Sequence, residues 1–333
     1  MIKYFKYLSL LTFLFADNEV CFEIEFNPNQ NQPGFGYFSK YVNVLDCFGI
    51  FAPSNISDEK VLHVAAVAAE LLDNNEDGEV DDLLIKNELA SRDALMPIFT
   101  SENSQAANSF FNNYNGDGVS AVLFNNEIDP SQPGHWGDDA SVEEIIHTIN
   151  HVGHVSIYPE TFNIEPNSSV MSDAMDIARG GQFINIPNQY PEEAWYHYDD
   201  WTCDYECMAI EYLYWCEVSY MGILDDIQTC NGIDNEWELC TPELFESTDV
   251  IMHSIIENPI YMLPQNAPDG NYCPNQNLLG DVNDDGIINI LDVILSINIV
   301  LQVDLFNNNA DINNDGTVDI LDIVLIVNII LGN

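Results

Sequence analysis

Two loops near the C-terminus carry the residue types that bind a hard cation. They begin at Asp281 and Asp311, and each presents carboxylate or amide side chains at positions 1, 3, 5, 9 and 12 of a twelve-residue segment. Position 6 is glycine in both loops, which permits a sharp turn, and position 7 supplies a backbone carbonyl. One such loop could arise by chance, whereas two in the same register indicate a duplicated Ca²⁺-binding unit.

The loops differ from EF-hands because position 12 is aspartate and no full helix precedes either loop. A calcium loop followed by one apolar helix, present twice within Leu279–Asn333, resembles the type I dockerin of cellulosome assemblies. The resemblance implies a small all-α calcium-binding module that docks on a cohesin-like domain of a scaffold or surface protein. The calcium ligands that it implies are Asp281, Asn283, Asp285, Asn289 and Asp292 in the first loop, and Asp311, Asn313, Asp315, Asp319 and Asp322 in the second.

The same resemblance assigns partner recognition to matching positions of the two repeats. They are Ile290, Leu291, Ile297, Asn298 and Gln302, then Ile320, Leu321, Val327, Asn328 and Gly332. Because these residues nearly match, we expect two docking orientations related by a pseudo-twofold axis. Two alternatives stay open: the loops are acidic turns that cap core helices, or the apolar face packs on the protein's own central domain. The run Ile320–Leu331 is too short to span a membrane.

A third acidic loop follows a helix that is predicted to begin after the N-cap residue Ser57. Its oxygen-bearing residues at positions 1, 3, 5 and 9 are Asp73, Asn75, Asp77 and Asp81, with Gly78 at position 6. Position 12 is Leu84, so the last ligand would have to be Asp82 or a residue of the next helix such as Glu88. The pattern indicates a structural calcium site, and the alternative is an acidic turn between helices.

The candidate for catalysis is a run of glutamates and histidines. Glu143, His147 and His151 follow one another at four-residue intervals, so a helix would place them on one face, where they could bind zinc. Thr148 stands where HExxH metalloproteases carry their general base, so Glu144 or Glu143 would have to act as the base. The alternative is that the glutamates stabilise the helix dipole and the histidines are ordinary surface or core residues.

Two helices are predicted to position these groups. The first begins at Ser141, which forms a predicted capping box with Glu144. The second runs on from Asp204 and places Glu211 sixty residues after His151. A glutamate on a later helix is the third zinc ligand of gluzincin-like peptidases, so Glu211 is a candidate ligand. The alternative for this segment is aromatic packing around a disulfide.

The eight cysteines favour disulfide bonds in an oxidising compartment. Cys203 and Cys207 lie four residues apart, on one face if helical; the alternative, a zinc site, lacks a second cysteine or histidine pair nearby. The central region resembles a group of exported proteins that share the patterns EExxH and YDDxTCxYxC. An export signal is predicted at residues 1–16, where Lys3 and Lys6 precede an apolar stretch. We therefore expect a secreted or cell-surface protein.

The charge of the chain excludes partners that are themselves anionic. Its 55 acidic and 7 basic residues give a formal net charge of −48, which disfavours binding of nucleic acid or anionic lipid. Such a surface suits calcium, or a salty medium that screens self-repulsion.

The expected architecture is mainly α. We predict a large, mostly helical central domain at 17–263 with a few short strands, one of them at Val20–Phe26, a linker at 264–278, and the small all-α dockerin-like module at 279–333. Two functions remain open for the central domain. It is either a metal-dependent hydrolase, with polysaccharide breakdown as the setting that the resemblance implies, or a non-catalytic binding or structural component held by calcium and disulfides. No other motif decides between them.

Overall fold

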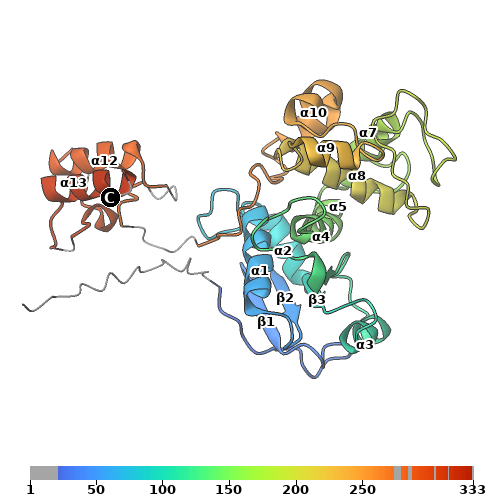
Figure 1. The fold of residues 1–333 in the computed structure, drawn as a ribbon, viewed down its shortest axis with the longest axis horizontal. Coiled ribbons are helices and arrows are strands. Elements are labelled where there is room, and N and C mark those ends of the chain that lie inside the picture. The colour runs from blue at the N-terminus through green and yellow to red at the C-terminus, as the bar shows by residue number, and fades with distance from the viewer. Residues whose placement is uncertain (1–21, 274–278, 284–286, 304, 314, 332–333) are drawn as a thin grey trace, which may run out of the picture.

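The computed structural model describes residues 22–273, 279–283, 287–303, 305–313 and 315–331. The fold is mainly α, with 43% helix and a small four-stranded sheet among these residues, which confirms the expected fold class (Figure 1). The predicted signal at 1–16, Cys21, the linker residues 274–278 and the candidate ligand Asp285 lie outside the described residues.

The sheet has the order β1-β2-β3-β4, in which β1 is antiparallel to β2 and the other neighbours are parallel. The strands are β1 (Lys40–Val44), β2 (Phe48–Ala52), β3 (Leu95–Phe99) and β4 (Leu123–Phe124). The strand predicted at Val20–Phe26 is not formed in its described part, where Glu25 makes one isolated bridge to Tyr41. Phe22 and Ile24 pack against the main core, but Phe26 is 94% exposed and the described residues of this segment pair with the sheet at Glu25 alone.

Alternate residues of the sheet face two different cores. Ile50, Met96 and Ile98 join the main core, in which helix α1 (Asp58–Leu72) packs on β1 and β2. Residues such as Phe51 on the opposite face join an aromatic cluster with α3 (Gln105–Asn113). The sheet thus lies between α1 and α3, and α1 begins at the predicted N-cap Ser57.

The remaining helices of the central domain are packed around α4 and α8. Helix α4 contacts α1 and α8, and α8 contacts α7, α10 and α11. In chain order the elements are α2 (Leu83–Ser91), the 3-10 turn η1 (Asn125–Glu127), α4 (Ser141–Ile149), the π-helix η2 (Asn150–His154), α5 (Val155–Ile157), α6 (Pro159–Phe162), α7 (Val170–Ala178), α8 (Tyr205–Tyr220), α9 (Ile227–Ile233), α10 (Pro242–Thr248) and α11 (Val250–Ile256).

Residues 264–273, predicted as part of a linker, pack on the central domain. The backbone amide of Gly270 donates to Glu70 Oε2 at 3.0 Å, and Tyr272, which is 2% exposed, donates its hydroxyl to Asp73 Oδ2 at 2.6 Å. The proline, glycine and asparagine content of this stretch is typical of a linker or of a pinned domain edge, and its aromatic and backbone groups have partners on α1.

Disulfide bonds join Cys203 to Cys207 and Cys230 to Cys240, and Cys273 is also disulfide-bonded. The predicted disulfides are therefore confirmed for these residues, and the zinc alternative for Cys203 and Cys207 is excluded. Cys47 and Cys216 are free thiols and are buried, which departs from the expectation that the whole set is paired.

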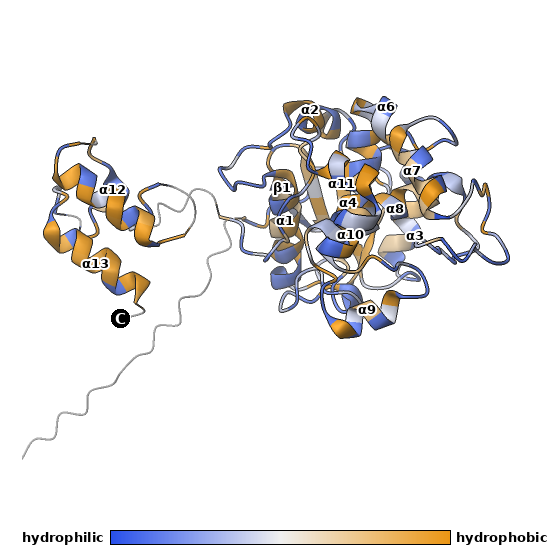
Figure 2. Ribbon diagram, turned by 90° about the horizontal axis from the view of Figure 1, so that it is seen from above, coloured by the Kyte–Doolittle hydropathy of each residue, from blue (hydrophilic) through white to orange (hydrophobic). Residues whose placement is uncertain are grey.

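The C-terminal residues form two apolar helices with a core of their own. Helices α12 (Ile290–Val300) and α13 (Ile320–Ile330) pack together, with the 3-10 turn η3 (Asn308–Ala310) between them in sequence. Their core is small and consists of Val282, Val293, Ala310, Ile323 and Ile326. Both helices also carry many apolar residues that are exposed to solvent (Figure 2). None of the described helices combines the length and apolar character needed to cross a membrane.

Candidate metal centre

Helix α4 carries the predicted catalytic residues, but it begins differently from the expected capping box. Ala140 is the N-cap and makes no side-chain cap bond, while Ser141 is the first helical residue. The Ser141 hydroxyl donates to Asp139 Oδ1 at 2.8 Å, and Asp139 is buried next to His63 Nε2 at 3.0 Å. The capping-box prediction was wrong because the buried Asp139, which the local pattern does not reveal, takes the serine hydroxyl.

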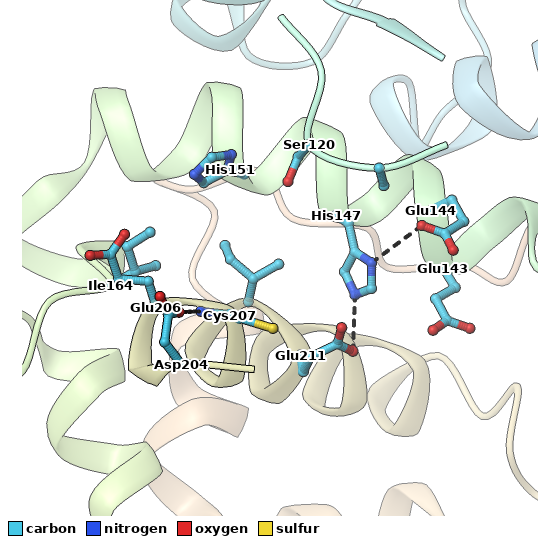
Figure 3. A pocket seen from close by; sticks show the side chains of 12 residues that line it. Ser120, Glu143, Glu144, His147, His151, Ile164, Asp204, Glu206, Cys207 and Glu211 are labelled. Carbon is cyan, nitrogen blue, oxygen red and sulfur yellow. Dashed lines mark hydrogen bonds and ion pairs between the residues drawn. The ribbon is translucent and has the colours of Figure 1, made fainter. Parts of the chain in front are cut away.

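Three side chains from α4 and α8 converge on one point. Glu143 and His147 are one turn apart on α4, Glu211 comes from α8, and their potential ligand atoms all lie within 4.8 Å of one another (Figure 3). His147 Nε2 lies 3.3 Å from Glu211 Oε2. Because α4 packs on α8, residues sixty-four positions apart in sequence meet in space. We refer to Glu143, His147 and Glu211 as the trio.

His147 is the best-placed ligand of the trio. It is 7% exposed, and its Nε2 atom is buried without a hydrogen-bond partner among the described residues. Burial lowers the pKa of His147, but Glu211 and Glu144 raise it more, so its pKa lies well above the ordinary value. A buried imidazole nitrogen that faces a carboxylate without a hydrogen bond fits a position from which a cation is held.

The two glutamates of α4 take different positions around His147. Glu144 Oε2 lies 3.7 Å from His147 Nδ1, on the ring edge away from Glu211. This is where an outer carboxylate orients a metal-binding histidine. Burial raises the pKa of Glu143 to about 8, with Glu144 and Glu211 adding to the rise and His147 opposing it. A cation at the trio would relieve this repulsion among carboxylates.

The structure does not bring His151 to the trio. The chain winds as a π-helix from Asn150 to His154, so the four-residue spacing of an α-helix no longer applies after Ile149. His151 is exposed and lines the cavity beside the trio, but its ring nitrogens are not among the converging ligand atoms. Asn150 Nδ2 donates to Glu217 Oε1 on α8 at 3.0 Å, and this buried contact holds the π-turn against α8.

A cavity of about 400 Å³ opens next to the trio. Its wall includes all three residues together with Glu144 and His151 from the α4 side. Glu211 and Cys207 lie on α8 opposite them, as Figure 3 shows. The Cys203–Cys207 disulfide ties the start of α8 to the preceding loop, which helps to fix the wall on this side. The cavity is large enough to admit a substrate side chain.

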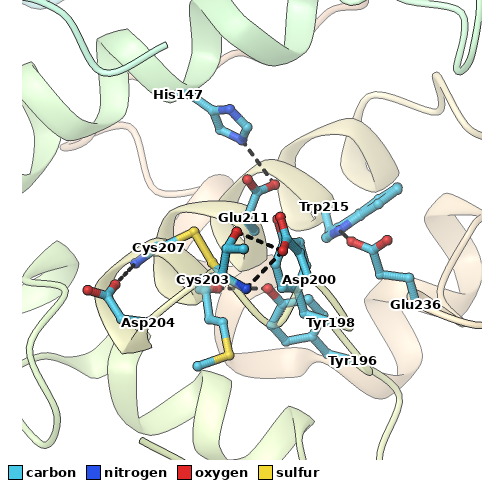
Figure 4. Close-up of a disulfide and its surroundings, with 12 residues drawn as sticks. His147, Tyr196, Tyr198, Asp200, Cys203, Asp204, Cys207, Glu211, Trp215 and Glu236 are labelled. Atoms are coloured by element: carbon cyan, nitrogen blue, oxygen red, sulfur yellow. Dashed lines mark hydrogen bonds and ion pairs between the residues drawn. A yellow bond between two sulfur atoms is a disulfide. The ribbon is translucent and has the colours of Figure 1, made fainter. Parts of the chain in front are cut away.

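A second cavity, of about 180 Å³, shares Glu143 and Glu211 with the first. It adds Glu236, whose Oε1 accepts a hydrogen bond from Trp215 Nε1 at 3.1 Å, and the loop residue Tyr198 (Figure 4). Burial raises the pKa of Glu236 to about 7, the hydrogen bond from Trp215 opposes this, and Glu211 adds to the rise. Glu236 stands in a segment without periodicity, so no sequence pattern marks it as a site residue.

The loops next to α12 and α13 are held in shape by hydrogen bonds from backbone amides to their aspartates in the described parts. Asp311 accepts hydrogen bonds from the amides of Asp315 and Gly316 at 3.1 and 2.8 Å, and Gly316 has a φ of 88°. Asp322, fully buried, accepts from the amides of Asn313 and Asp319. These bonds fold the loop around the carboxylate at position 1 and join position 12 to positions 3 and 9.

The first loop repeats this arrangement where it is described. Asp292 is fully buried and accepts from the amides of Val282, Asn283 and Asn289 at 2.8, 3.3 and 2.8 Å. Asn289 and Asp319 are the N-caps of α12 and α13, and Asp292 and Asp322 complete a capping box in each. Each loop is thus joined to its helix by the residues at its positions 9 and 12.

Comparison with known protein families decides the nature of this region. Residues 279–331 match the family described as dockerin type I domain. They form a type I dockerin. The domain is a calcium-binding module that docks on cohesin domains in cellulosome-like assemblies, and proteins that carry it are typically extracellular or attached to the cell surface. Comparison of the chain with curated proteins and with solved structures found no significant match.

The loop at Asp73 shares part of its hydrogen bonding with the second dockerin loop. Asp73 accepts from the amides of Asp77 and Gly78 at 3.2 and 2.8 Å, and Gly78 has a φ of 96°. Asn75 accepts from the amide of Asp77 at 2.9 Å, as Asn313 does from that of Asp315 in the dockerin.

The two loops differ at their last positions. In the Asp73 loop, Asp81 at position 9 accepts from the backbone amide of Asn74 at position 2, at 2.9 Å. In the first dockerin loop, the amide at position 2 donates instead to Asp292 at position 12. Asp82 caps α2 and also accepts from the Tyr158 hydroxyl, so it is committed to the helix start.

Proposed function

We propose that the central domain is a metal-dependent hydrolase that the dockerin attaches to a cohesin-bearing scaffold outside the cell. The observation that carries the proposal is the buried Nε2 atom of His147, which has no hydrogen-bond partner among the described residues and faces Glu211 at 3.3 Å with Glu143 beside it. Two carboxylates and one imidazole supply donor atoms that a catalytic metal ion accepts, and they lie beside an open cavity.

The ligand set narrows the choice of metal. Zinc binds histidine and glutamate, and iron and manganese also accept a set with two carboxylates and one imidazole. When bound, such an ion would polarise a substrate carbonyl and lower the pKa of a water molecule. Glu143 stands in the converging set and His151 does not. The set therefore has more carboxylate oxygen, a hard ligand, than a set with two histidines would have.

Glu144 would serve the reaction from the edge of the cavity. It lines the cavity and lies 3.7 Å from His147 Nδ1, so it would hold the ring in the orientation that points Nε2 at Glu211. As the general base, Glu144 would accept a proton from the attacking water and pass it to the leaving group as the scissile bond breaks. The oxygen of that water would become bonded to the carbon that it attacks, which gives a carboxylic acid when the substrate is an amide or an ester.

Export and calcium complete the proposed role. The predicted signal at 1–16 and the disulfides support secretion, and the dockerin's family association favours polysaccharide-degrading assemblies as the setting. We also assign a structural calcium to the loop Asp73, Asn75, Asp77 and Asp81. Its hydrogen-bond pattern is shared in part with the second dockerin loop, and it anchors Tyr272 of the segment that leads to the dockerin.

The second candidate is a non-catalytic binding or structural domain. It is supported by the two carboxylates that flank His147, since a protonated imidazole between Glu211 and Glu144 forms a stable ion-paired group without any metal. In this case the trio would be a buried charge cluster between α4 and α8, and calcium with the disulfides would account for the stability of the domain.

Metal analysis of the full chain separates the two functions. The protein is purified without chelators, and zinc, iron and manganese are measured by mass spectrometry. We expect one transition metal per chain in the wild type, none in His147→Ala, and an unchanged amount in Glu246→Gln, which removes an exposed charge elsewhere. A wild type that takes up no transition metal when supplied with all three ions would exclude the hydrolase and leave the structural role.

A further inference from the structure

The second cavity lies beside the trio and has an unusual lining. Three aromatic rings and five carboxylates surround about 180 Å³, and none of its lining residues is lysine, arginine or histidine. Two of the carboxylates, Glu143 and Glu211, belong to the trio and also line the first cavity. Glu211 in this shared wall is the residue that the buried Nε2 of His147 faces, and this Nε2 has no hydrogen-bond partner among the described residues. A ligand that fills both cavities would therefore cross the metal centre.

The charge of this cavity selects a positive group. Its other carboxylates are Glu236, Asp199 and Asp200, of which Glu236 is held by Trp215 and Asp200 by Thr202. The five carboxylates surround about 180 Å³, so they repel one another when ionised. A cation placed among them would lower the electrostatic free energy.

The aromatic rings indicate an organic cation rather than a second metal ion. Trp215 is 4% exposed and forms the inner wall, whereas Trp136 is 40% exposed and lies on the outer side. Aromatic faces attract ammonium and guanidinium groups but supply no ligand atoms to a hard metal ion. Aromatic rings together with carboxylates around a small space are therefore suited to the end of a lysine or arginine side chain.

The first cavity favours a peptide over a sugar as the carrier of this cation. Apart from its histidines, its described lining has no aromatic ring on which a sugar could stack, and it contains the aliphatic residues Ala121, Ile164 and Ile210. These would contact a small or aliphatic side chain. Both cavities carry carboxylates, so the difference between them is that aromatic rings line the second and aliphatic residues line the first.

We propose that the cavity formed by Trp136, Tyr198, Trp215 and Glu236 binds the lysine or arginine side chain of a peptide substrate, next to the bond held at the metal centre. A small or aliphatic residue on the other side of that bond would occupy the first cavity. The cleavage rests on the hydrolase function proposed above, whereas the binding of the basic side chain depends only on the cavity and is measured separately.

The test uses the full chain and two matched hexapeptides that differ in one residue, lysine in one and norleucine in the other. Binding is followed by the change in tryptophan fluorescence, and cleavage by mass spectrometry. We expect the wild type to bind the lysine peptide about tenfold more tightly, because norleucine keeps the alkyl chain and lacks the charge. Glu236→Gln should lose this preference while it keeps the trio, and the exposed Glu246→Gln should retain it.

Glu236→Gln preserves an oxygen that can accept the Trp215 hydrogen bond, and an unchanged melting temperature would confirm that the variant is folded. Preference for lysine without cleavage would support the cavity assignment and count against the hydrolase. Equal affinity for both peptides in the wild type would overturn the assignment and leave the hydrolase standing. Tight binding of a glucosamine oligosaccharide with none of either peptide would overturn the choice of a peptide.

Discussion

His147 Nε2 and Glu211 Oε2 face each other at 3.3 Å across the contact between α4 and α8, and the nitrogen makes no hydrogen bond to any described residue. The distance is within the range of an ion pair, but the geometry is not that of a directed N–H···O bond. Buried polar atoms normally have such a partner, and Nε2 of His147 is one of a few among the described residues that do not, so it needs a physical cause. A cation held by both atoms and by Glu143 would satisfy all three groups at once.

Metal binding at the trio should strengthen as pH rises. Glu211 and Glu144 outweigh burial and raise the pKa of His147 well above its ordinary value, and burial raises the pKa of Glu143 to about 8. Below these pKa values the metal must displace a proton from each group. We expect affinity to rise about tenfold per pH unit for each displaced proton between about pH 6 and about pH 8. Competition with a chromophoric chelator measures it, and an affinity independent of pH would contradict the assignment.

Glu144→Gln distinguishes a catalytic from a positioning role for Glu144. If Glu144 only orients His147 through Nδ1, the variant should bind metal about 10- to 100-fold more weakly and regain full activity when the metal is saturating. If it is also the base, activity should stay low at saturating metal. We expect the second result because Glu144 lines the cavity as well as contacting the ring. The measurement is a metal titration that follows binding and hydrolysis in parallel.

Glu217 should make the central domain less stable as pH rises. It is fully buried, Asn150 donates to its Oε1, and its Oε2 has no partner among the described residues. Burial raises its pKa to about 8, against about 4.3 in an unfolded chain. Between these values the folded state keeps a proton that the unfolded state releases. The stability that this proton contributes is fully present below about pH 4.3 and is lost as pH rises toward about 8.

The matching variant is Glu217→Gln, which keeps an oxygen for Asn150 and cannot titrate. Over this window the unfolding free energy of the wild type should fall more steeply than that of the variant, by about 1.4 kcal/mol per pH unit. Urea unfolding at constant calcium measures the difference. Parallel pH profiles for the two proteins would show that Glu217 is ionised in the folded state, and the exposed Glu246→Gln should follow the wild type.

The parts of the structure that follow from neighbouring residues could be predicted from the sequence. The dockerin loops and their helices are local, so ligand types, glycine positions and helix starts can be read in one stretch. Glu143 and His147 meet for the same reason, since one helical turn separates them. Glu211 required the further expectation that two helices pack together, and that expectation holds.

The parts that depend on distant contacts could not be predicted. His151 leaves the predicted face because a π-helix replaces the α-helix at Asn150, and that residue is bonded to Glu217, sixty-seven positions away. At Gly153 the side chain of Ile85 lies so close that an added Cβ atom would be 3.2 Å from its Cγ2, so a larger residue would crowd this turn. The strands β1 to β4 are too short to give a periodic pattern in the sequence. Glu236 lies outside any periodic segment, so its place in the cavity wall could not be read from the sequence.

The loop at Asp73 should bind a third calcium ion, in addition to the two of the dockerin. Asp77→Ala removes the carboxylate at position 5, so we expect the calcium content of the full chain to fall by one ion. Glu79→Ala is the matched control, because position 7 contributes its backbone carbonyl and the side chain of Glu79 is directed to Lys86 instead. Equilibrium dialysis with radioactive calcium counts the ions. The same content in Asp77→Ala and in the wild type would show that this loop is an acidic turn.

Docking of the dockerin should tolerate either of two single substitutions and fail only with both. Leu291 and Leu321 occupy matching positions on α12 and α13 and are 52% and 58% exposed. Burying a leucine contributes about 2 kcal/mol, and an aspartate in its place would be buried without a partner, so each substitution should disable one docking orientation. Because the partner can then use the other orientation, Leu291→Asp and Leu321→Asp should each bind within about twofold of the wild type, with weak salt dependence.

The double variant should lose binding to immobilised cohesin domains, measured by surface plasmon resonance in calcium. Leu305→Asp is the control, since Leu305 is 91% exposed and lies outside both faces. All variants should retain the calcium content of the wild type, which shows that the loops are intact. Loss of binding in one single variant would exclude the symmetric mode and assign the interaction to that repeat. If no variant changes the affinity, the apolar faces of α12 and α13 do not contact the cohesin, and another surface of the dockerin must do so.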